Sequence, residues 1–114
     1  MNMIDSYRFG DIVIDGKQYS ADVIIFPERV QSNWWRKTGH ELCLEDITGV
    51  IAEKPDVLVV GTGESGMMKV LPEVEEMAKN QRITLIAEPT DNACKTYNQM
   101  VLSQRTIAAL HISC

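Results

Sequence analysis

The second half of this chain alternates short apolar runs with segments of helical periodicity, and this alternation restricts the possible folds more than any other feature. Three apolar runs, at residues 56–60, 82–88 and 106–114, are predicted strands. Nearly continuous apolar strands are typical of a parallel sheet that is covered on both faces. The segments between them, near residues 70–78 and 93–101, carry apolar side chains at helical spacing. The second half therefore predicts a β-α-β-α-β unit.

The first half of the chain predicts a β-hairpin followed by two further short elements. Residues 9–14 and 19–26 flank Asp15-Gly16, a pair that favours the tight type I′ turn of hairpins. Segment 30–35, which contains valine and two tryptophans, predicts a third short strand. Residues 44–51 show one apolar face at helical spacing and predict a short helix.

These elements predict a single α/β domain over residues 1–114, with a mixed central sheet that includes the N-terminal hairpin and with helices packed on the sheet. The hydrophobic content of 45% suffices for one packed core. The formal net charge of −5 and the scattered lysines and arginines argue against a nucleic-acid partner, which would require a basic face. No run approaches the roughly 20 apolar residues that span a membrane, so we expect no membrane association.

The cysteines and the N-terminus indicate a cytoplasmic protein. Cys43, Cys94 and Cys114 are odd in number and form no Cys-x-x-Cys pair, so they do not predict a disulfide framework. Chains without such a framework are typical of reducing compartments. The first ten residues, MNMIDSYRFG, lack the apolar core of a secretory signal peptide.

The glycines of GTGESG (61–66) have the G-x-G-x-x-G spacing of a dinucleotide-binding turn. They follow a predicted strand, and the acidic Glu88 ends the next strand, as in such sites. Pro72 argues against this function. Proline prefers the first turn of a helix, so the following helix is predicted to begin near residue 72, too late for its N-terminus to hold a pyrophosphate. The spacing thus favours a tight strand exit over a nucleotide site.

A shallow pocket is nevertheless expected at this edge of the sheet, because ligands of open α/β sheets bind beyond the carboxyl ends of parallel strands. Thr90 or Asp91 is also expected to cap the third helix through its side-chain oxygen. Ser113-Cys114 would join the rim if the last strand is parallel. The residues predicted to form the pocket are Gly61, Thr62, Gly63, Glu88 and Thr90.

Two His-x-x-Cys pairs, His40 with Cys43 and His111 with Cys114, offer four possible zinc ligands. Residues 111 and 114 lie on one predicted strand, where an odd spacing directs two side chains to opposite faces. We therefore expect no structural metal, and no cofactor is predicted. Thiol catalysis by Cys114 finds no support either, because nothing in the sequence places a histidine base beside it.

The tryptophan pair Trp34-Trp35, followed by Arg36, is a candidate interaction surface. On a strand, adjacent side chains point to opposite faces, so one tryptophan can enter the core while the other lies exposed. An exposed tryptophan beside an arginine is a composition typical of protein-interface hot spots. The alternative is that both rings pack within the fold.

Five segments of the chain form a specific series in this order: RFGDIVIDGKQY, WWRKTGHELCLEDI, KPDVLVVGTG, TDNACKTYNQM and RTIAALHISC. Together they resemble a family of small single-domain proteins that includes the adipogenesis-associated domain-containing protein and the mitochondrial assembly factor of respiratory complex I. The resemblance implies a mixed sheet with helices on its faces, and a GTG turn followed by a loop and a proline-started helix. It adds Tyr97, Asn98 and Arg105 to the candidate residues.

The resemblance and the residues together predict a non-enzymatic protein-interaction or assembly factor, with a protein partner or self-association. The family offers no catalytic motif to carry over, and many of its prokaryotic members have no assigned function. The chain begins without a targeting presequence, so the mitochondrial role is not transferred. The alternative is a protein or enzyme that binds a small nucleotide-like or anionic ligand at the GTG turn.

Overall fold

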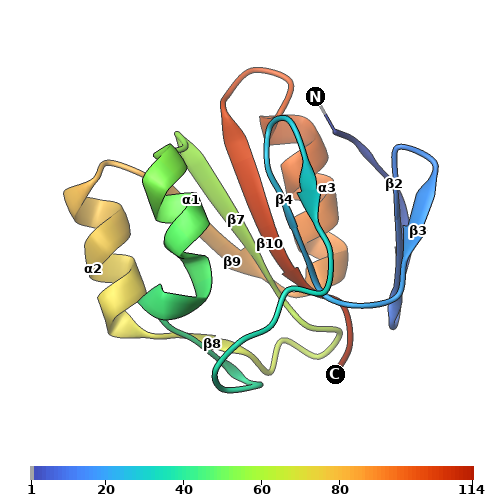
Figure 1. Cartoon of the computed structure of the whole chain (residues 1–114), viewed down its shortest axis with the longest axis horizontal. Coiled ribbons are helices and arrows are strands. Elements are labelled where there is room, and N and C mark those ends of the chain that lie inside the picture. The colour runs from blue at the N-terminus through green and yellow to red at the C-terminus, as the bar shows by residue number, and fades with distance from the viewer. Residues whose placement is uncertain (1) are drawn as a thin grey trace.

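The centre of the structure is a five-stranded mixed sheet with the order β5-β4-β10-β7-β9. The structure is a computed structural model that describes residues 2–114. Figure 1 shows the central strands flanked by helices, with a separate antiparallel sheet at one side. The strands are β1 (Ile4–Arg8), β2 (Asp11–Ile14), β3 (Lys17–Tyr19), β4 (Val23–Ile25), β5 (Val30–Gln31), β6 (Glu41–Leu42), β7 (Val57–Thr62), β8 (Lys69–Val70), β9 (Thr84–Glu88) and β10 (Thr106–His111). The helices are the 3-10 helix η1 (Leu44–Ile47), α1 (Thr48–Glu53), α2 (Pro72–Asn80) and α3 (Thr90–Met100).

The three strands of the second half are parallel to one another, which confirms the predicted β-α-β-α-β unit. Strand β7 lies between β10 and β9 and is parallel to both. Every residue of β7 and of β10 is buried, because helices cover both faces of the sheet at this point. The almost uninterrupted apolar sequence of these strands is the direct consequence.

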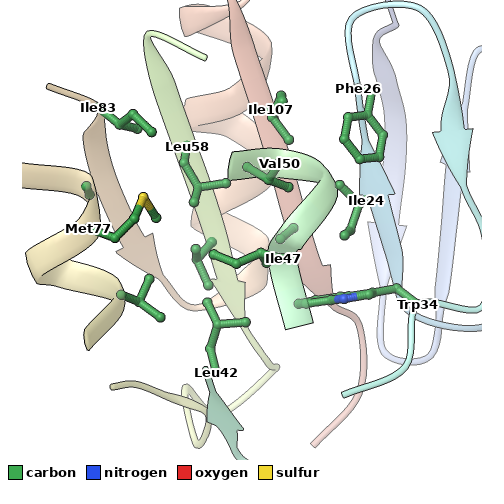
Figure 2. Packing of buried hydrophobic residues seen from close by; sticks show 14 of the residues in the cluster. Ile24, Phe26, Trp34, Leu42, Ile47, Val50, Leu58, Met77, Ile83 and Ile107 are labelled. Atoms are coloured by element: carbon green, nitrogen blue, oxygen red, sulfur yellow. The ribbon is translucent and has the colours of Figure 1, made fainter. Parts of the chain in front are cut away.

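Alternate residues of β7 enter two separate cores. Leu58 and Val60 pack in the core beneath α1 and α2, whereas Val57 and Val59 pack in the core beneath α3. Figure 2 shows the first core, in which Trp34 reaches toward Ile47 and the sheet. Because successive side chains of a strand point to opposite faces of the sheet, this one short strand contributes side chains to both cores.

The N-terminal hairpin differs from the prediction. The Asp15-Gly16 turn is as expected, with positive φ angles of 49° and 80°, but it joins β2 to β3 in a separate three-stranded sheet with β1. The segment predicted as one strand, 19–26, is divided between β3 and β4. The central sheet is mixed because β4 is antiparallel to β10 and β5 is antiparallel to β4.

Pro72 is the first residue of α2, as the sequence predicts, and Leu71 is its N-cap. The helix thus begins nine positions after Gly63, and the intervening loop contains only the short strand β8, which pairs with β6. The capping prediction for α3 is wrong, because Pro89 occupies the N-cap and Thr90 is already helical. The Thr90 side chain binds two neighbouring strands instead.

Candidate functional site

The parallel strands β7, β9 and β10 end together at one edge of the central sheet, which we term the carboxyl edge (residues 61–63, 88–90 and 111–114). The strand register places His111 opposite Thr62 and Glu88 opposite Gly61. Parallel strands leave their last residues at the same edge, so these positions meet although they are far apart in sequence. The carboxyl edge therefore gathers polar residues from three strands and is the candidate site.

Thr90 connects the ends of two strands at the carboxyl edge. Its side chain is completely buried, and its Oγ1 donates to the carbonyl oxygen of His111 at 2.5 Å. The same oxygen accepts from the backbone N–H of Gly63 at 2.9 Å. Both hydrogen-bonding functions of the hydroxyl are thus used within the chain, which gives Thr90 a structural role at this edge.

The glycines of the GTG turn allow the chain to pack closely on itself. A Cβ atom at Gly61 would lie 2.9 Å from both Leu110 Cδ2 and Thr90 Oγ1. At Gly63, whose φ is +103°, it would lie 2.8 Å from the backbone oxygen of Ser113. The space beside these two glycines is therefore filled by the chain's own atoms.

The other predicted pocket residues also have internal contacts. Thr62 is buried, and Glu88 accepts a hydrogen bond from Thr96 Oγ1 at 2.6 Å. Two cavities, of about 260 and 160 Å³, are lined by residues outside the predicted pocket, at 37–45 with 71–73 and at 4–7 with 91–98. The structure brings the five predicted residues to one edge of the sheet, and their role in binding a ligand stays a prediction.

A buried ion network of Asp22, Arg36 and His111 lies beside the carboxyl edge. Arg36 Nη1 donates to Asp22 Oδ2 at 2.7 Å, and His111 Nδ1 lies 2.9 Å from the same oxygen. The antiparallel pairing of β4 with β10 sets Val23 opposite Leu110, which brings the preceding Asp22 to His111. Sequence reasoning missed Asp22 because this contact joins positions 89 residues apart.

The network holds Asp22 in its ionised form. Burial alone would raise the pKa of Asp22, but hydrogen bonds from His111, from the backbone N–H of Ile112 and from Arg36 outweigh burial and lower it. The Arg36 side chain is only 5% exposed, so its charge depends on this carboxylate for compensation. Arg36 was predicted to lie on an interaction surface, and its burial corrects that prediction.

The contact of His111 Nδ1 with Asp22 Oδ2 favours the ring tautomer that carries its proton on Nδ1. A hydrogen bond to the Asp22 carboxylate is charge-assisted and favours this tautomer. Arg36 Nη2 also lies 3.0 Å from Nδ1, and it has the carbonyl oxygen of Gly39 as its own acceptor at 3.0 Å. The lone pair then resides on Nε2, which is buried without a hydrogen-bond partner among residues 2–114. An unpaired buried polar atom costs about 1–3 kcal/mol.

The two tryptophans differ sharply in exposure. Trp34 is 4% exposed and donates from Nε1 to the carbonyl oxygen of Asp46 at 2.9 Å, whereas Trp35 is 81% exposed. The pair lies in an irregular loop after β5 rather than on the predicted strand. Of the three residues predicted for the interaction surface, only Trp35 is therefore on the surface.

Three of the four candidate metal ligands come together. One ring nitrogen of His40, one of His111 and Sγ of Cys114 all lie within 4.8 Å of one another. The argument that residues 111 and 114 face opposite ways is wrong, because β10 ends at His111 and the chain leaves the strand there. Cys43 is apart from this group, and its Sγ lies 3.3 Å from a carboxylate oxygen of Asp46.

The model of the family described as "Protein of unknown function (DUF498/DUF598)" matches residues 4–112. The chain belongs to the DUF498 family. This finding, with the relatives described next, confirms the resemblance that the sequence segments indicate.

Relatives of this DUF498 chain include one solved structure and two curated proteins. A conserved hypothetical protein from Pyrococcus horikoshii OT3 is 31% identical, with a TM-score of 0.83 and coverage of 97% of this chain and 98% of that chain. The NADH dehydrogenase (ubiquinone) 1 alpha subcomplex assembly factor 3 of Xenopus tropicalis is 23% identical over 108 residues, which are 93% of this chain. A "13 kDa major membrane protein" of Francisella tularensis is 31% identical over 64 residues, which are 55% of this chain.

The matched region spans only part of the two curated relatives, 58% of the assembly factor and 50% of the Francisella protein. The name of the Francisella protein refers to a membrane. Within residues 2–114 of the present chain, no helix has both the length and the apolar character that crossing a membrane requires.

The three residues that the resemblance adds to the candidates make contacts within the fold. Tyr97 is completely buried and donates from its hydroxyl to the carbonyl oxygen of Asn2 at 2.8 Å. The amide of Asn98 bonds both the N–H and the carbonyl of Ile4, at 2.9 and 2.8 Å, and thereby ties β1 to α3. Arg105 pairs with Glu53 at 3.1 Å at the opposite end of β10 from the carboxyl edge.

The three free cysteines of the DUF498 chain are expected to react at very different rates. Burial and then the negative charge of Asp91 raise the pKa of Cys94 to about 12, so at pH 8 only about one thiol in 10⁴ is the reactive thiolate. Cys114 is exposed. Alkylation with iodoacetamide at pH 8, followed by peptide mapping, should modify Cys114 rapidly and Cys94 only after unfolding.

The control for the alkylation experiment is the same reaction in guanidinium chloride, where all three thiols should react. Equal rates for Cys94 and Cys114 in the native chain would contradict the buried position of Cys94.

The raised pKa of Cys94 also makes the stability of the fold depend on pH in the alkaline range. Native stability should fall between about pH 9 and pH 12, because in that range only the unfolded chain releases the Cys94 proton.

Proposed function

We propose that this chain is a non-enzymatic protein-interaction or assembly domain that binds a protein partner through the loops around its carboxyl edge. The observation that carries the proposal is the 81% exposure of Trp35. Tryptophan is the residue type most enriched at the energetic centres of protein interfaces. A large aromatic side chain left in water loses the favourable free energy of burial, which a partner surface would supply.

The two neighbours of Trp35 fix its position. Trp34 is anchored in the core by its indole hydrogen bond, and its backbone N–H donates to the carbonyl oxygen of Asp22 at 2.8 Å. Arg36 is held by Asp22 and Gly39, and its guanidinium lies 4.8 Å from the centre of the Trp34 ring. The exposed indole is thus presented from a restrained backbone, which lowers the entropy cost of binding.

Two further exposed apolar side chains, Phe9 and Met67, come from loops at the same edge. The Phe9 loop is bound to the chain end by a hydrogen bond of 2.7 Å from the N–H of Gly10 to the carbonyl oxygen of Ile112. Met67 lies in the loop that follows the GTG turn. Figure 1 shows that these loops and the C-terminus lie at one end of the molecule, so a partner could contact several of them at once.

The relatives support this function over the alternative. An assembly factor aligns with 93% of this chain, which favours a role in binding other proteins. A nucleotide-like or anionic ligand at the GTG turn has less support, because the chain itself fills the space beside Gly61 and Gly63. We also propose a cytoplasmic location, which agrees with the three unpaired cysteines.

Photo-crosslinking tests the proposal. A benzoylphenylalanine at position 35 should give discrete adducts with a partner protein, or with a second copy of the chain, in cells of the source organism. The matched control is position 102, because Leu102 is also exposed, at 66%, but lies beyond the C-terminus of α3. Adducts identical from both positions, or none from position 35, would contradict the proposed surface.

A thermal-shift panel of nucleotides, dinucleotides and acyl thioesters tests the alternative. A ligand present at 100 times its dissociation constant should stabilise the chain by about 2.7 kcal/mol. Stabilisation that is lost in a Thr62→Val variant would favour ligand binding at the GTG turn. No response across the panel, together with crosslinks from position 35, would support the interaction domain.

A further inference from the structure

Three potential metal ligands, His40, His111 and Cys114, converge beside the carboxyl edge. One ligand atom from each lies within 4.8 Å of the other two. Two imidazole nitrogens and one thiolate form a donor set that suits borderline-soft divalent ions such as Zn²⁺, and not hard ions such as Mg²⁺. The residues come from two distant stretches of the chain, so only the fold brings them together.

The unpaired ring nitrogen of His111, Nε2, indicates that this site takes a ligand. The side chain is 6% exposed, and Nε2 has no hydrogen-bond partner within residues 2–114. Nδ1 lies 2.9 Å from a carboxylate oxygen of Asp22, and a proton on Nδ1 leaves the Nε2 lone pair free. Histidines that bind metals are typically oriented by a carboxylate on the other ring nitrogen. Asp22 and His111 have this arrangement.

The His111 ring and residue 114 both lie close to Gly63. A Cβ atom at Gly63 would lie 3.0 Å from His111 Cδ2, the carbon next to Nε2, and 3.3 Å from the carbonyl oxygen of Cys114. That carbonyl accepts from the N–H of Ser65 at 3.1 Å. The last residues are thus held near the histidine by the loop that follows the GTG turn.

The third potential ligand is His40. The rings of His40 and His111 lie edge to face, with centroids 6.1 Å apart. The His40 backbone is bound through its carbonyl oxygen to the N–H of Lys69 at 2.8 Å. Ligand atoms around a tetrahedral ion lie about 3.3–3.7 Å apart. The side chains of His40 and Cys114 are both exposed, so they can turn by the small distance that closure requires and leave an entry path for the ion.

We propose that His111 Nε2, a ring nitrogen of His40 and the thiolate of Cys114 bind a divalent transition-metal ion of the Zn²⁺ type. Asp22 orients the His111 ring through its contact with Nδ1. Three protein ligands leave the fourth position to water or to a ligand from a bound molecule, as in open zinc sites. The Cys114 thiol releases its proton when the ion binds.

Titration with Co²⁺ tests the site directly in the full chain. One equivalent should produce a thiolate-to-cobalt absorption band in the near ultraviolet and the visible bands of tetrahedral cobalt. Zn²⁺ should displace the ion and remove the bands, whereas Mg²⁺ should not. Absence of the thiolate band at one equivalent would overturn the proposal.

Variants assign the ligands. Cys114→Ser should abolish the thiolate band, and His40→Gln should weaken Co²⁺ binding at least tenfold. Because the side chain of His40 is exposed, this variant is expected to keep the fold even if a His111 variant does not. The matched control is Cys43→Ser, which should leave the spectrum unchanged. A band that is lost in Cys43→Ser and kept in Cys114→Ser would overturn the assignment.

Protection from alkylation gives a second readout. One equivalent of Zn²⁺ should slow the reaction of Cys114 with iodoacetamide at least tenfold and leave the rate at Cys43 unchanged. Removal of the ion with a chelator should restore the Cys114 rate. Equal alkylation rates of Cys114 with and without Zn²⁺ would contradict coordination by this thiolate. This result would not depend on whether the chain binds a protein partner.

Discussion

Replacement of Arg36 with methionine is expected to lower the free energy of unfolding by about 3–5 kcal/mol, the usual cost of removing one partner of a buried ion pair. Methionine keeps much of the apolar volume of the arginine side chain and removes its charge. The Asp22 carboxylate, whose side chain is 15% exposed, would then lack the guanidinium that lies 2.7 Å away. Urea unfolding at pH 7, followed by circular dichroism, measures the difference.

The control for this prediction is Arg8→Met. Arg8 lies 3.7 Å from Asp11, and its side chain is 85% exposed, so its loss should cost under about 1 kcal/mol. The double variant Asp22→Asn with Arg36→Met should recover part of the stability, because no unpaired charge remains. A cost under 1 kcal/mol for Arg36→Met alone would show that the buried pair contributes little.

Gly63→Ala is expected to destabilise the fold by about 2–4 kcal/mol. The residue has a φ of +103°, where a side chain is strained. Its Cβ would also lie 2.8 Å from the backbone oxygen of Ser113, and backbone atoms cannot turn aside as a flexible side chain can. Thermal and urea unfolding of the variant measure both contributions together.

Gly39→Ala provides the comparison for Gly63→Ala. A Cβ at Gly39 would meet no atom within 4 Å, so its effect should stay within about 0.5 kcal/mol. If Gly63→Ala were as stable as Gly39→Ala, the chain end could not lie against the GTG turn. The same result would remove the packing that places residue 114 near His111.

The glycine turn illustrates what local sequence can and cannot predict. Pro72 correctly located the start of α2 and thereby argued against a pyrophosphate site, because the conformational preference of proline is local. The atoms that fill the space beside the glycines belong to Thr90, Leu110 and Ser113. The sequence predicted Thr90 and Ser113 at the same edge as the turn, but it did not predict that their atoms fill this space, because those contacts form only through the pairing of the strands.

The prediction that His111 and Cys114 point to opposite faces failed for a related reason. The sequence argument assumed that the last strand continued to residue 114, and a strand would have separated His111 from Cys114. The strand ends at His111, and the chain turns toward the GTG loop, where the carbonyl oxygens of Ser113 and Cys114 accept hydrogen bonds. Strand ends depend on such tertiary contacts, which periodicity does not encode.

The sequence by itself determined the fold class, the order of the second-half elements, the start of α2 and the Asp15-Gly16 turn. Each of these rests on a preference that neighbouring residues express locally, either apolar periodicity or restricted φ angles. The tertiary structure alone decided the division of the N-terminal segment between two sheets, the burial of Arg36 and the meeting of Asp22, His40 and Cys114 around His111. These features arise from contacts between distant positions, and such contacts exist only once the parallel strands have aligned their ends.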